Sequence, residues 1–346
     1  MRNDGFLTSR PVDTPVYSLV IPIFNEERVL PILLHRLDQL LDRLDGPAEV
    51  IFVDDGSTDA GGIVAAGRAK DDPRYRYLAL SRNFWHQVAI SAGMDAAAGQ
   101  AVIVMDADLQ DPPEVVLDLV AKWKEGFEIV YARRLSRDGE NWFKRRTADL
   151  FYRTLRRLTA VDIPADVGDF RLVDRKALEA FQAMPEKDRF VRGMFGWMGF
   201  RQTAVAYHRL SRAAGETKYT LPKMLRLALH GIVGFSDVPL RLALWMGAAV
   251  SLGALAFGAH VLWAALHNAD YVAGWASTIV MTSLLAGINL LMTGIVGVYV
   301  GRIHAEVKNR PLYLVGRAVG FPEGARAGLS LAARHPAAHL GQRAAS

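Results

Sequence analysis

Residues 101–114 read AVIVMDADLQDPPE, and this stretch decides the fold. It begins with the apolar run Ala101–Met105, which has the length and composition of a buried β-strand. Two carboxylates one residue apart, Asp106 and Asp108, follow the run directly. Because ligands bind beyond the carboxyl ends of the strands in open α/β sheets, we expect both carboxylates at a binding edge. Such a pair can hold Mg²⁺ or Mn²⁺ and still leave coordination positions for a diphosphate.

Four more apolar runs have the length of β-strands: Tyr17–Phe24, Glu49–Val53, Arg76–Leu80 and Ile129–Tyr131. Helical patterns separate them. In Pro31–Leu44, for example, apolar residues recur three and four apart, and the proline suits a first helical turn. Near-continuous apolar strands that alternate with helices predict an α/β domain with a mostly parallel, Rossmann-like sheet covered on both faces.

Two long segments near the C-terminus, Leu242–Leu266 and Tyr271–Gly301, carry no formal charge. Each exceeds the ~20 residues that a helix needs to cross a bilayer. The loop between them contains no Lys or Arg, whereas Arg241 and Arg302 flank the pair, so the positive-inside rule places both outer ends in the cytoplasm. The sequence therefore predicts two transmembrane helices. The alternative is a buried helical hairpin of a soluble protein, and uninterrupted segments of this length disfavour it.

The composition restricts the partners of the chain. Its 346 residues include no cysteine, which excludes disulfides, thiolate metal sites and cysteine nucleophiles. The net charge of +5 favours nucleic acid, anionic lipid or phosphate as partners. No nucleic-acid-binding motif accompanies this charge, so we expect membrane and phosphate rather than nucleic acid. Residues Met1–Thr14 lack the apolar core of a signal peptide, and we expect the part before the apolar segments to be cytoplasmic.

Basic residues gather ahead of the apolar segments. Between Tyr131 and Ala160 Lys and Arg outnumber Asp and Glu by nine to three. The later segment Leu221–Phe235 is amphipathic, with Lys223 and Arg226 set against leucines, and predicts a helix along a membrane surface. An ordinary core-facing helix is the alternative for this segment.

These patterns predict five consecutive parts. They are an N-terminal extension (1–15), a cytoplasmic α/β domain (16–220), an amphipathic interfacial helix (221–240), a two-helix transmembrane region (241–302) and a cytoplasmic C-terminal tail (303–346). No Pro-rich linker separates the parts, so we expect the α/β domain to lie close to the bilayer.

Three motifs occur in a fixed order: IPIFNEE (21–27), VDDGSTD (53–59) and DADLQDPPE (106–114). In this order and at these intervals they resemble family-2 glycosyltransferases of the GT-A fold. The resemblance extends through SRNFWHQVAISAGMDAAAG (81–99), GENWFKRR (139–146) and VGDFRL (167–172). With the two C-terminal spans, the pattern is similar to bactoprenol glucosyltransferases and, more distantly, to dolichol-phosphate mannose synthases. One position departs from it, because related sequences usually read SRNFG where this chain has Trp85.

The resemblance implies roles for individual residues. The donor diphosphate and its metal would be surrounded by Asp106, Asp108 and Gln110. Asp169 would lie beside the sugar and the acceptor phosphate, and with Asp108 it would form the catalytic pair. The nucleotide would be held by Pro22, Asn25, Glu26, Asp54 and Asp55. Phosphate and acceptor would be bound by Arg133, Lys144, Arg145, Arg209, Arg212 and Lys218. His86 lies within a matching stretch, but we interpret it as a structural histidine.

The implied reaction transfers a sugar from a UDP-sugar, with UDP-glucose as the first choice, to undecaprenyl phosphate. A phosphate monoester, with its second pKa near ~6, is largely dianionic at neutral pH and attacks without a strong base. Asp169 is therefore expected to orient the substrates first and to act as a base only second. In-line attack would invert the anomeric centre. The resemblance also implies Mg²⁺ or Mn²⁺ as cofactor, a bacterial inner membrane location and a homo-oligomer, by resemblance a tetramer.

Several alternatives remain open at this point. The sugar can be N-acetylglucosamine, galactose, mannose or a modified pentose instead of glucose. A processive polysaccharide synthase would carry a Q-x-x-R-W motif, and the nearest segment, Val191–Trp197, lacks that spacing. A non-catalytic membrane scaffold that binds sugar nucleotides is a further possibility, against which the intact pair Asp106 and Asp108 argues.

Overall fold

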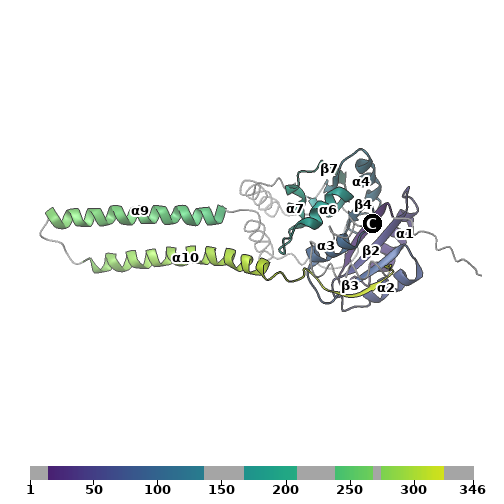
Figure 1. Cartoon of the computed structure of the whole chain (residues 1–346), viewed down its shortest axis with the longest axis horizontal. Coiled ribbons are helices and arrows are strands. Elements are labelled where there is room, and N and C mark those ends of the chain that lie inside the picture. The colour runs from purple at the N-terminus through teal and green to yellow at the C-terminus, as the bar shows by residue number, and fades with distance from the viewer. Residues whose placement is uncertain (1–14, 136–166, 209–237, 268–273, 323–346) are drawn as a thin grey trace, which may run out of the picture. The chain divides into compact units, whose positions relative to one another are not determined.

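The computed structural model describes residues 15–135, 167–208, 238–267 and 274–322. The described residues divide into two compact units. The sheet unit contains 15–135, 167–208 and 310–322, and the helical unit contains 238–267 and 274–309. Figure 1 shows both.

One eight-stranded sheet organises the sheet unit (Figure 1). Its strands are β1 (Tyr17–Ile23), β2 (Ala48–Asp54), β3 (Tyr75–Leu80), β4 (Ala101–Val104), β5 (Ile129–Arg134), β6 (Val167–Asp174), β7 (Gln202–Tyr207) and β8 (Val315–Val319). They follow the order β7-β5-β6-β4-β1-β2-β3-β8. The five strands predicted from apolar runs correspond to β1 to β5. The strands β6, β7 and β8 were not predicted.

The sheet is mixed: four strand pairs are parallel, as expected for a mostly parallel sheet, and three are antiparallel, which the sequence did not indicate. β1 to β4 form a parallel centre, and β5 and β7 are parallel to each other. β6, between β4 and β5, is antiparallel to both, and β8 is antiparallel to β3. All strands except β6 and β8 therefore run in one direction. Their carboxyl ends, together with the start of β6, form one edge of the sheet, which we call the carboxyl edge.

Helices cover both faces of the sheet, as the apolar strands predict. They are α1 (Leu30–Leu41), α2 (Gly61–Asp71), α3 (His86–Ala96), α4 (Val115–Lys124), α6 (Arg175–Ala183) and α7 (Val191–Trp197). In β1, Leu19 and Ile21 belong to a buried cluster with residues of α1, α2 and α4. Val20 points to the other face, where it meets α3 so closely that a Cβ at Gly93 would lie 2.2 Å from its Cγ1. Glycine is therefore required where α3 crosses the sheet.

The last described segment of the sheet unit adds a strand to its edge. β8 pairs with β3, although the sequence places these residues in a C-terminal tail. Tyr313, just before β8, is 2% exposed, and its hydroxyl donates a hydrogen bond of 3.1 Å to Asp95 Oδ2 on α3. Phe321, after β8, is also buried and lies under the guanidinium of Arg76. These contacts make residues 310–322 part of the sheet unit.

The hydrogen bond of Tyr313 gives a testable contribution to stability. Tyr313→Phe keeps the buried ring and removes the donor to Asp95, so we expect the free energy of unfolding to fall by about 1 kcal/mol. Chemical denaturation of the detergent-solubilised chain measures this change. Tyr131→Phe in β5 is the control and is expected to change stability by less than ~0.5 kcal/mol. An unchanged stability of Tyr313→Phe would contradict the contact.

The helical unit consists of α9 (Val238–His267) and α10 (Trp275–Val307). Within them, Val238–His260 and Leu284–Val307 are long and apolar enough to cross a membrane, with mean hydropathies of 1.8 and 1.9. Their apolar side chains are mostly exposed, unlike those of a buried hairpin in a soluble core. The two helices thus match the predicted pair of long segments. The predicted interfacial helix lies, apart from its last three residues, outside the described residues.

Candidate active site

The predicted site residues that the structure describes follow strands at the carboxyl edge. Asn25 follows β1, Asp55 follows β2, and Asp106 follows β4. Asp169 comes from β6, the antiparallel strand that starts at this edge. Val104 pairs with Arg171 in the β4–β6 ladder, so Asp106, two residues later, and Asp169, two residues earlier, lie opposite each other. The antiparallel placement of β6 thus brings together two carboxylates 63 positions apart in the sequence.

His86 lies between these two carboxylates. Its Nε2 is 3.3 Å from Asp106 Oδ1 and 3.3 Å from Asp169 Oδ2. Burial alone would lower the pKa of His86, but the bond to Asp169 and the charges of both carboxylates outweigh it and raise that pKa to about 9. The sequence interpretation gives His86 a structural role, and the structure places its ring in contact with both carboxylates of the site. The sequence signal was its place at the start of the helix after β3.

Asp169 is the most strongly held carboxylate of the site. Arg192 donates from Nε to Oδ1 at 2.8 Å and from Nη2 to Oδ2 at 3.1 Å, which is a bidentate ion pair. Gln87 Nε2 donates to Oδ2 at 3.1 Å. Although burial opposes it, the positive charges of Arg192 and His86 hold the pKa of Asp169 well below its usual range. A carboxylate in this state is a poor proton acceptor, which favours the orienting role over the role of a general base.

Arg192 and Gln87 were not identified from the sequence. Gln87 also accepts a hydrogen bond of 3.1 Å from the backbone N–H of Val191, so α3 and α7 are joined at the site. In the sequence, Arg192 lies in the segment Val191–Trp197, which lacks the spacing of the Q-x-x-R-W motif. Its role depends on the fold bringing α7 to β6, which no local pattern indicates.

The residues present fit a divalent cation bound with a diphosphate. Asp106 Oδ1 is buried and accepts no hydrogen bond, although His86 lies nearby. The desolvation of Asp106, with added repulsion from Asp169, raises its pKa to about 6, so its negative charge calls for a positive partner. Asp108 Oδ1 accepts from the backbone N–H of Gln110 at 3.1 Å. Within the described ranges no group of three or more His, Asp or Glu side chains is arranged to hold a metal ion. Mg²⁺ is commonly bound by one or two carboxylates together with substrate phosphates and water.

The predicted nucleotide residues form two interlocked loops. Asn25, with a left-handed φ of 58°, accepts from the N–H of Thr58 at 2.8 Å and donates its own N–H to Ser57 Oγ at 3.0 Å. Asp54 accepts from the N–H of Ser57 at 2.8 Å and from the hydroxyl of Tyr77 at 2.7 Å. One oxygen of Asp54 thus holds the loop, and the other is bound by Tyr77 of β3. Its contact with a nucleotide stays a prediction.

The other residues predicted to bind the nucleotide differ in how far they are exposed. Asp55 is buried, which raises its pKa, and its Oδ1 accepts from the N–H of Phe84 at 2.6 Å. Glu26 is half-buried, and its carbonyl accepts the first hydrogen bonds leading into α1. Pro22 is buried inside β1. Asp55 therefore connects the end of β2 to the loop between β3 and α3, which bears His86.

The predicted phosphate-binding residues are described only in part. Arg133 is exposed at the end of β5, on the carboxyl edge. The others, Lys144, Arg145, Arg209, Arg212 and Lys218, lie outside the described residues. Beside Arg133, the Nε of Arg134 donates to the hydroxyl of Tyr207 at 3.2 Å, and that hydroxyl donates to Asp111. These two hydrogen bonds connect the loop that carries Asp106 and Asp108 to β5 and β7.

Trp85 precedes His86 and has an unusual backbone conformation. Its φ of 76° and ψ of 152° lie in a region that glycine occupies and that costs a bulky residue ~1–3 kcal/mol. The position is the one where related sequences usually have glycine. Hydrogen bonds fix the backbone on both sides: the N–H of Trp85 donates to Asn83 Oδ1 at 3.0 Å, and its carbonyl accepts the first bonds of α3. The indole ring is nevertheless 78% exposed.

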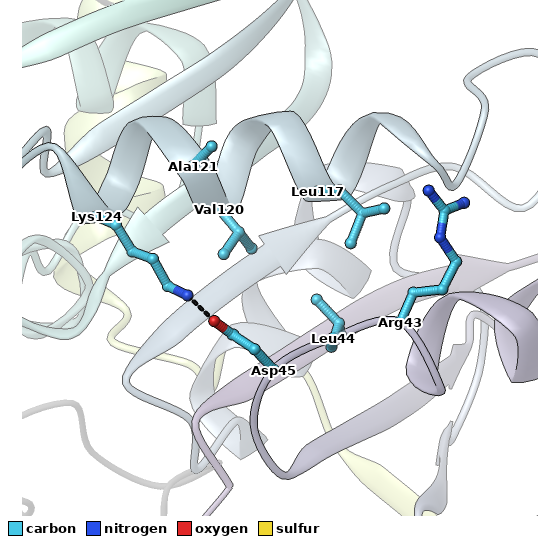
Figure 2. A pocket seen from close by; sticks show the side chains of 7 residues that line it. All are labelled: Arg43, Leu44, Asp45, Leu117, Val120, Ala121 and Lys124. Carbon is cyan, nitrogen blue, oxygen red and sulfur yellow. Dashed lines mark hydrogen bonds and ion pairs between the residues drawn. The ribbon is translucent and has the colours of Figure 1, made fainter.

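A shallow groove of about 230 Å³ lies elsewhere on the sheet unit (Figure 2). Leu117 and Val120 of α4 line it together with Leu44, and Lys124 pairs with Asp45 at one end. Asp45 also accepts a hydrogen bond of 2.7 Å from the hydroxyl of Tyr17, the first residue of β1. The groove therefore lies toward the amino ends of the strands and is separate from the site.

Comparisons with known proteins show the family of the chain. The family model described as glycosyl transferase family 2 matches residues 18–181. The uncharacterized glycosyltransferase YkcC of Bacillus subtilis is 48% identical over 88% of this chain and 94% of its own length. A prophage bactoprenol glucosyl transferase homolog of Escherichia coli is 37% identical over 87% of this chain and 98% of its own length.

Further similarity is found in a phage-derived protein and in a solved structure. The SfII prophage-derived bactoprenol glucosyl transferase of Shigella flexneri is 38% identical over 86% of this chain and 96% of its own length. A glucosyl-3-phosphoglycerate synthase from Mycobacterium tuberculosis in complex with UDP gives a TM-score of 0.43 at 19% identity, covering 63% of this chain and 78% of that chain. The chain belongs to glycosyl transferase family 2, in which it is of the bactoprenol glucosyl transferase type.

Proposed function

We propose that the chain transfers a sugar, with inversion, from a UDP-sugar to a polyprenyl phosphate at the cytoplasmic face of a bacterial inner membrane. UDP-glucose and undecaprenyl phosphate are the first choices, and the product is a lipid-linked sugar for modification of a cell-surface glycan. The observation that carries the proposal is the state of Asp169. Its oxygens are held by Arg192 and Gln87, and its pKa is lowered, so the carboxylate is a poor base.

A site without a strong base needs an acceptor that is already ionised. A hydroxyl acceptor must lose a proton during attack, which requires a positioned base. A phosphate monoester has its second pKa near ~6 and is largely a dianion at neutral pH. Its oxygen forms the new bond to the anomeric carbon while the bond to the nucleoside diphosphate breaks, and no proton has to move. The printed names of the relatives, bactoprenol glucosyl transferases, support this class of acceptor.

The residues of the carboxyl edge would have different roles in the reaction. Asn25 and Asp55 would bind the nucleoside. Asp106 and Asp108 would hold Mg²⁺ or Mn²⁺, which when bound supplies positive charge that stabilises the leaving diphosphate. Arg192 and His86 keep Asp169 ionised, and Asp169 would orient the sugar beside the attacking phosphate. Arg133 at the edge would attract the acceptor phosphate.

The helical unit supports a membrane location. α9 and α10 present exposed apolar side chains over lengths sufficient to cross a bilayer, and Arg241 and Arg302 lie toward the outer ends of the pair. We propose that both helices span the membrane and that the sheet unit is cytoplasmic. This arrangement supplies a lipid acceptor directly to a membrane-anchored enzyme. The homo-oligomer, by resemblance a tetramer, remains part of the proposal.

The donor and the acceptor can be tested together. Radiolabelled UDP-glucose, UDP-N-acetylglucosamine, UDP-galactose and GDP-mannose are offered separately to the purified full chain with undecaprenyl phosphate and Mg²⁺ or Mn²⁺. We expect label to enter the organic phase with one donor, UDP-glucose first. If label is transferred from a different donor, the identity of the sugar changes and the rest of the proposal stands. Retention of all labels in the aqueous phase, with donor binding intact, would favour the non-catalytic scaffold.

A further inference from the structure

The indole of Trp85 is exposed although its backbone conformation is unfavourable. Its exposed fraction of 78% is the largest among the large apolar side chains of the described residues. A ring so exposed buries little apolar surface in return for the strain at its φ of 76°. Strain of this kind persists where a function requires the side chain. The sequence position is thus better explained by a contact with a ligand than by the fold.

Trp85 lies between residues that contact the active site. The residue before it, Phe84, donates its N–H to Asp55 on the proposed nucleotide side. The two residues after it, His86 and Gln87, contact Asp169. The loop therefore joins the nucleotide side to the buried carboxylate, and the exposed indole projects from its middle.

Other exposed apolar side chains share this edge. Five of the seven large ones in the described sheet unit follow the carboxyl end of a strand or lie in the first turn of the next helix: Phe24, Ile32, Ile63, Trp85 and Leu135. Apolar side chains that stay exposed along the edge where ligands bind offer contacts to an apolar group. The ligand that enters this edge therefore has an apolar part.

The sugar is not the apolar part of the ligand. The anomeric carbon has to lie beside Asp106 and Asp169, and Asp169 is only 5% exposed, whereas the indole faces outward. The acceptor of the proposed reaction combines an apolar chain with a phosphate. An indole suits the boundary between apolar and polar groups, and Arg82, exposed three residues earlier, adds a positive charge for the phosphate.

We propose that Trp85 determines acceptor specificity by packing against the isoprenoid chain of the polyprenyl phosphate next to its phosphate. This inference rests on the proposed function. It assigns to Trp85 a contact with the acceptor and none with the donor. The ring makes the enzyme prefer a long isoprenoid chain over a short one, at the expense of stability.

Trp85→Gly separates the effect of Trp85 on stability from its effect on acceptor binding. Glycine relieves the backbone strain, so we expect the melting temperature of the full chain to rise by ~2–4 °C. Loss of the ring is expected to raise the KM for undecaprenyl phosphate ~10-fold and to leave the KM for the UDP-sugar within ~2-fold. The preference for undecaprenyl phosphate over a one-unit isoprenyl phosphate, as a ratio of kcat/KM, should fall ~10-fold. Trp85→Phe is expected to keep most of this preference.

Trp197→Ala is the matched control. Trp197 is also an exposed tryptophan, at 67%, but it ends α7 shortly before β7 begins, on the side of the amino ends of the strands. It is expected to leave both KM values unchanged. An unchanged acceptor KM in Trp85→Gly and Trp85→Ala would overturn the inference, and so would a raised donor KM with the chain-length preference intact. If the wild-type chain transfers sugar to no polyprenyl phosphate, the proposed function itself fails before any variant is compared.

Discussion

Asp108→Asn is expected to lower kcat at least ~100-fold with little change in stability. Asp108 is half-buried, like the nearby Asp106, and its Oδ1 accepts a hydrogen bond from the N–H of Gln110. An amide oxygen can keep that hydrogen bond, so the turn should persist. The negative charge that would hold a divalent cation is lost. Label transfer at saturating donor and acceptor measures kcat, and the melting temperature reports the fold.

The matched control for this substitution is Asp118→Asn. Asp118 is exposed on α4, and its replacement makes the same change of charge away from the carboxyl edge. We expect its kcat to stay within ~2-fold of the wild type, because surface substitutions of this kind have small effects. Full turnover by a folded Asp108→Asn protein would show that the assignment of the cation to this residue is wrong.

Arg192→Met is expected to lower the free energy of unfolding by ~3 kcal/mol and to abolish most transfer activity. The substitution removes the bidentate partner of Asp169, whose carboxylate is 5% exposed and would keep only the more distant positive groups of His86, at 3.3 Å, and Arg171, at 4.0 Å. Adding Asp169→Asn removes the charge of the carboxylate, so the double variant should be more stable than Arg192→Met alone. Chemical denaturation of the four proteins in one detergent gives the coupling between the two residues.

Arg28→Met serves as the control for loss of an arginine. Arg28 is exposed in the loop before α1, and its replacement should change stability by less than ~0.5 kcal/mol. A wild-type stability of Arg192→Met would contradict the account. So would a double variant whose loss of stability, relative to the wild type, equals the sum of the two single losses. In either case Asp169 would not depend on Arg192 for its ionised state.

The sequence predicts the centre of the fold well because the information there is local. β1 to β4 are largely apolar runs, and polar residues that follow them are brought to one edge by the parallel arrangement. Asp106 and Asp55 could therefore be assigned to that edge from the sequence alone. The two apolar helices were predictable for the same reason, since length and composition suffice.

The remainder of the site depends on contacts between distant segments. β6 carries the buried charges Asp169 and Arg171, so its sequence does not read as an apolar strand. Its antiparallel insertion between β4 and β5 sets the position of Asp169, and no periodicity indicates that pairing. Arg192 reaches Asp169 only because α7 packs beside α3. β8 is short and contains an arginine and a glycine, which conceals it within an apparent tail.

Trp85 shows a different limit of sequence reasoning. The departure from glycine was visible in the sequence, but its meaning required the backbone conformation and the exposure of the ring. A tryptophan at a negative φ and buried against α3 would have been a packing residue. The observed combination of strain and exposure instead directs attention to the acceptor.

The central claim is that this site, in which Asp169 is a poor base, uses an acceptor that is already ionised. Its most direct test compares undecaprenyl phosphate with undecaprenol, the alcohol with the same chain, as acceptors for the same labelled UDP-sugar and the same full-length protein. We predict transfer to the phosphate and none to the alcohol, because Asp169, held by Arg192, is a poor acceptor for the hydroxyl proton. Transfer to undecaprenol at a comparable rate would contradict the account.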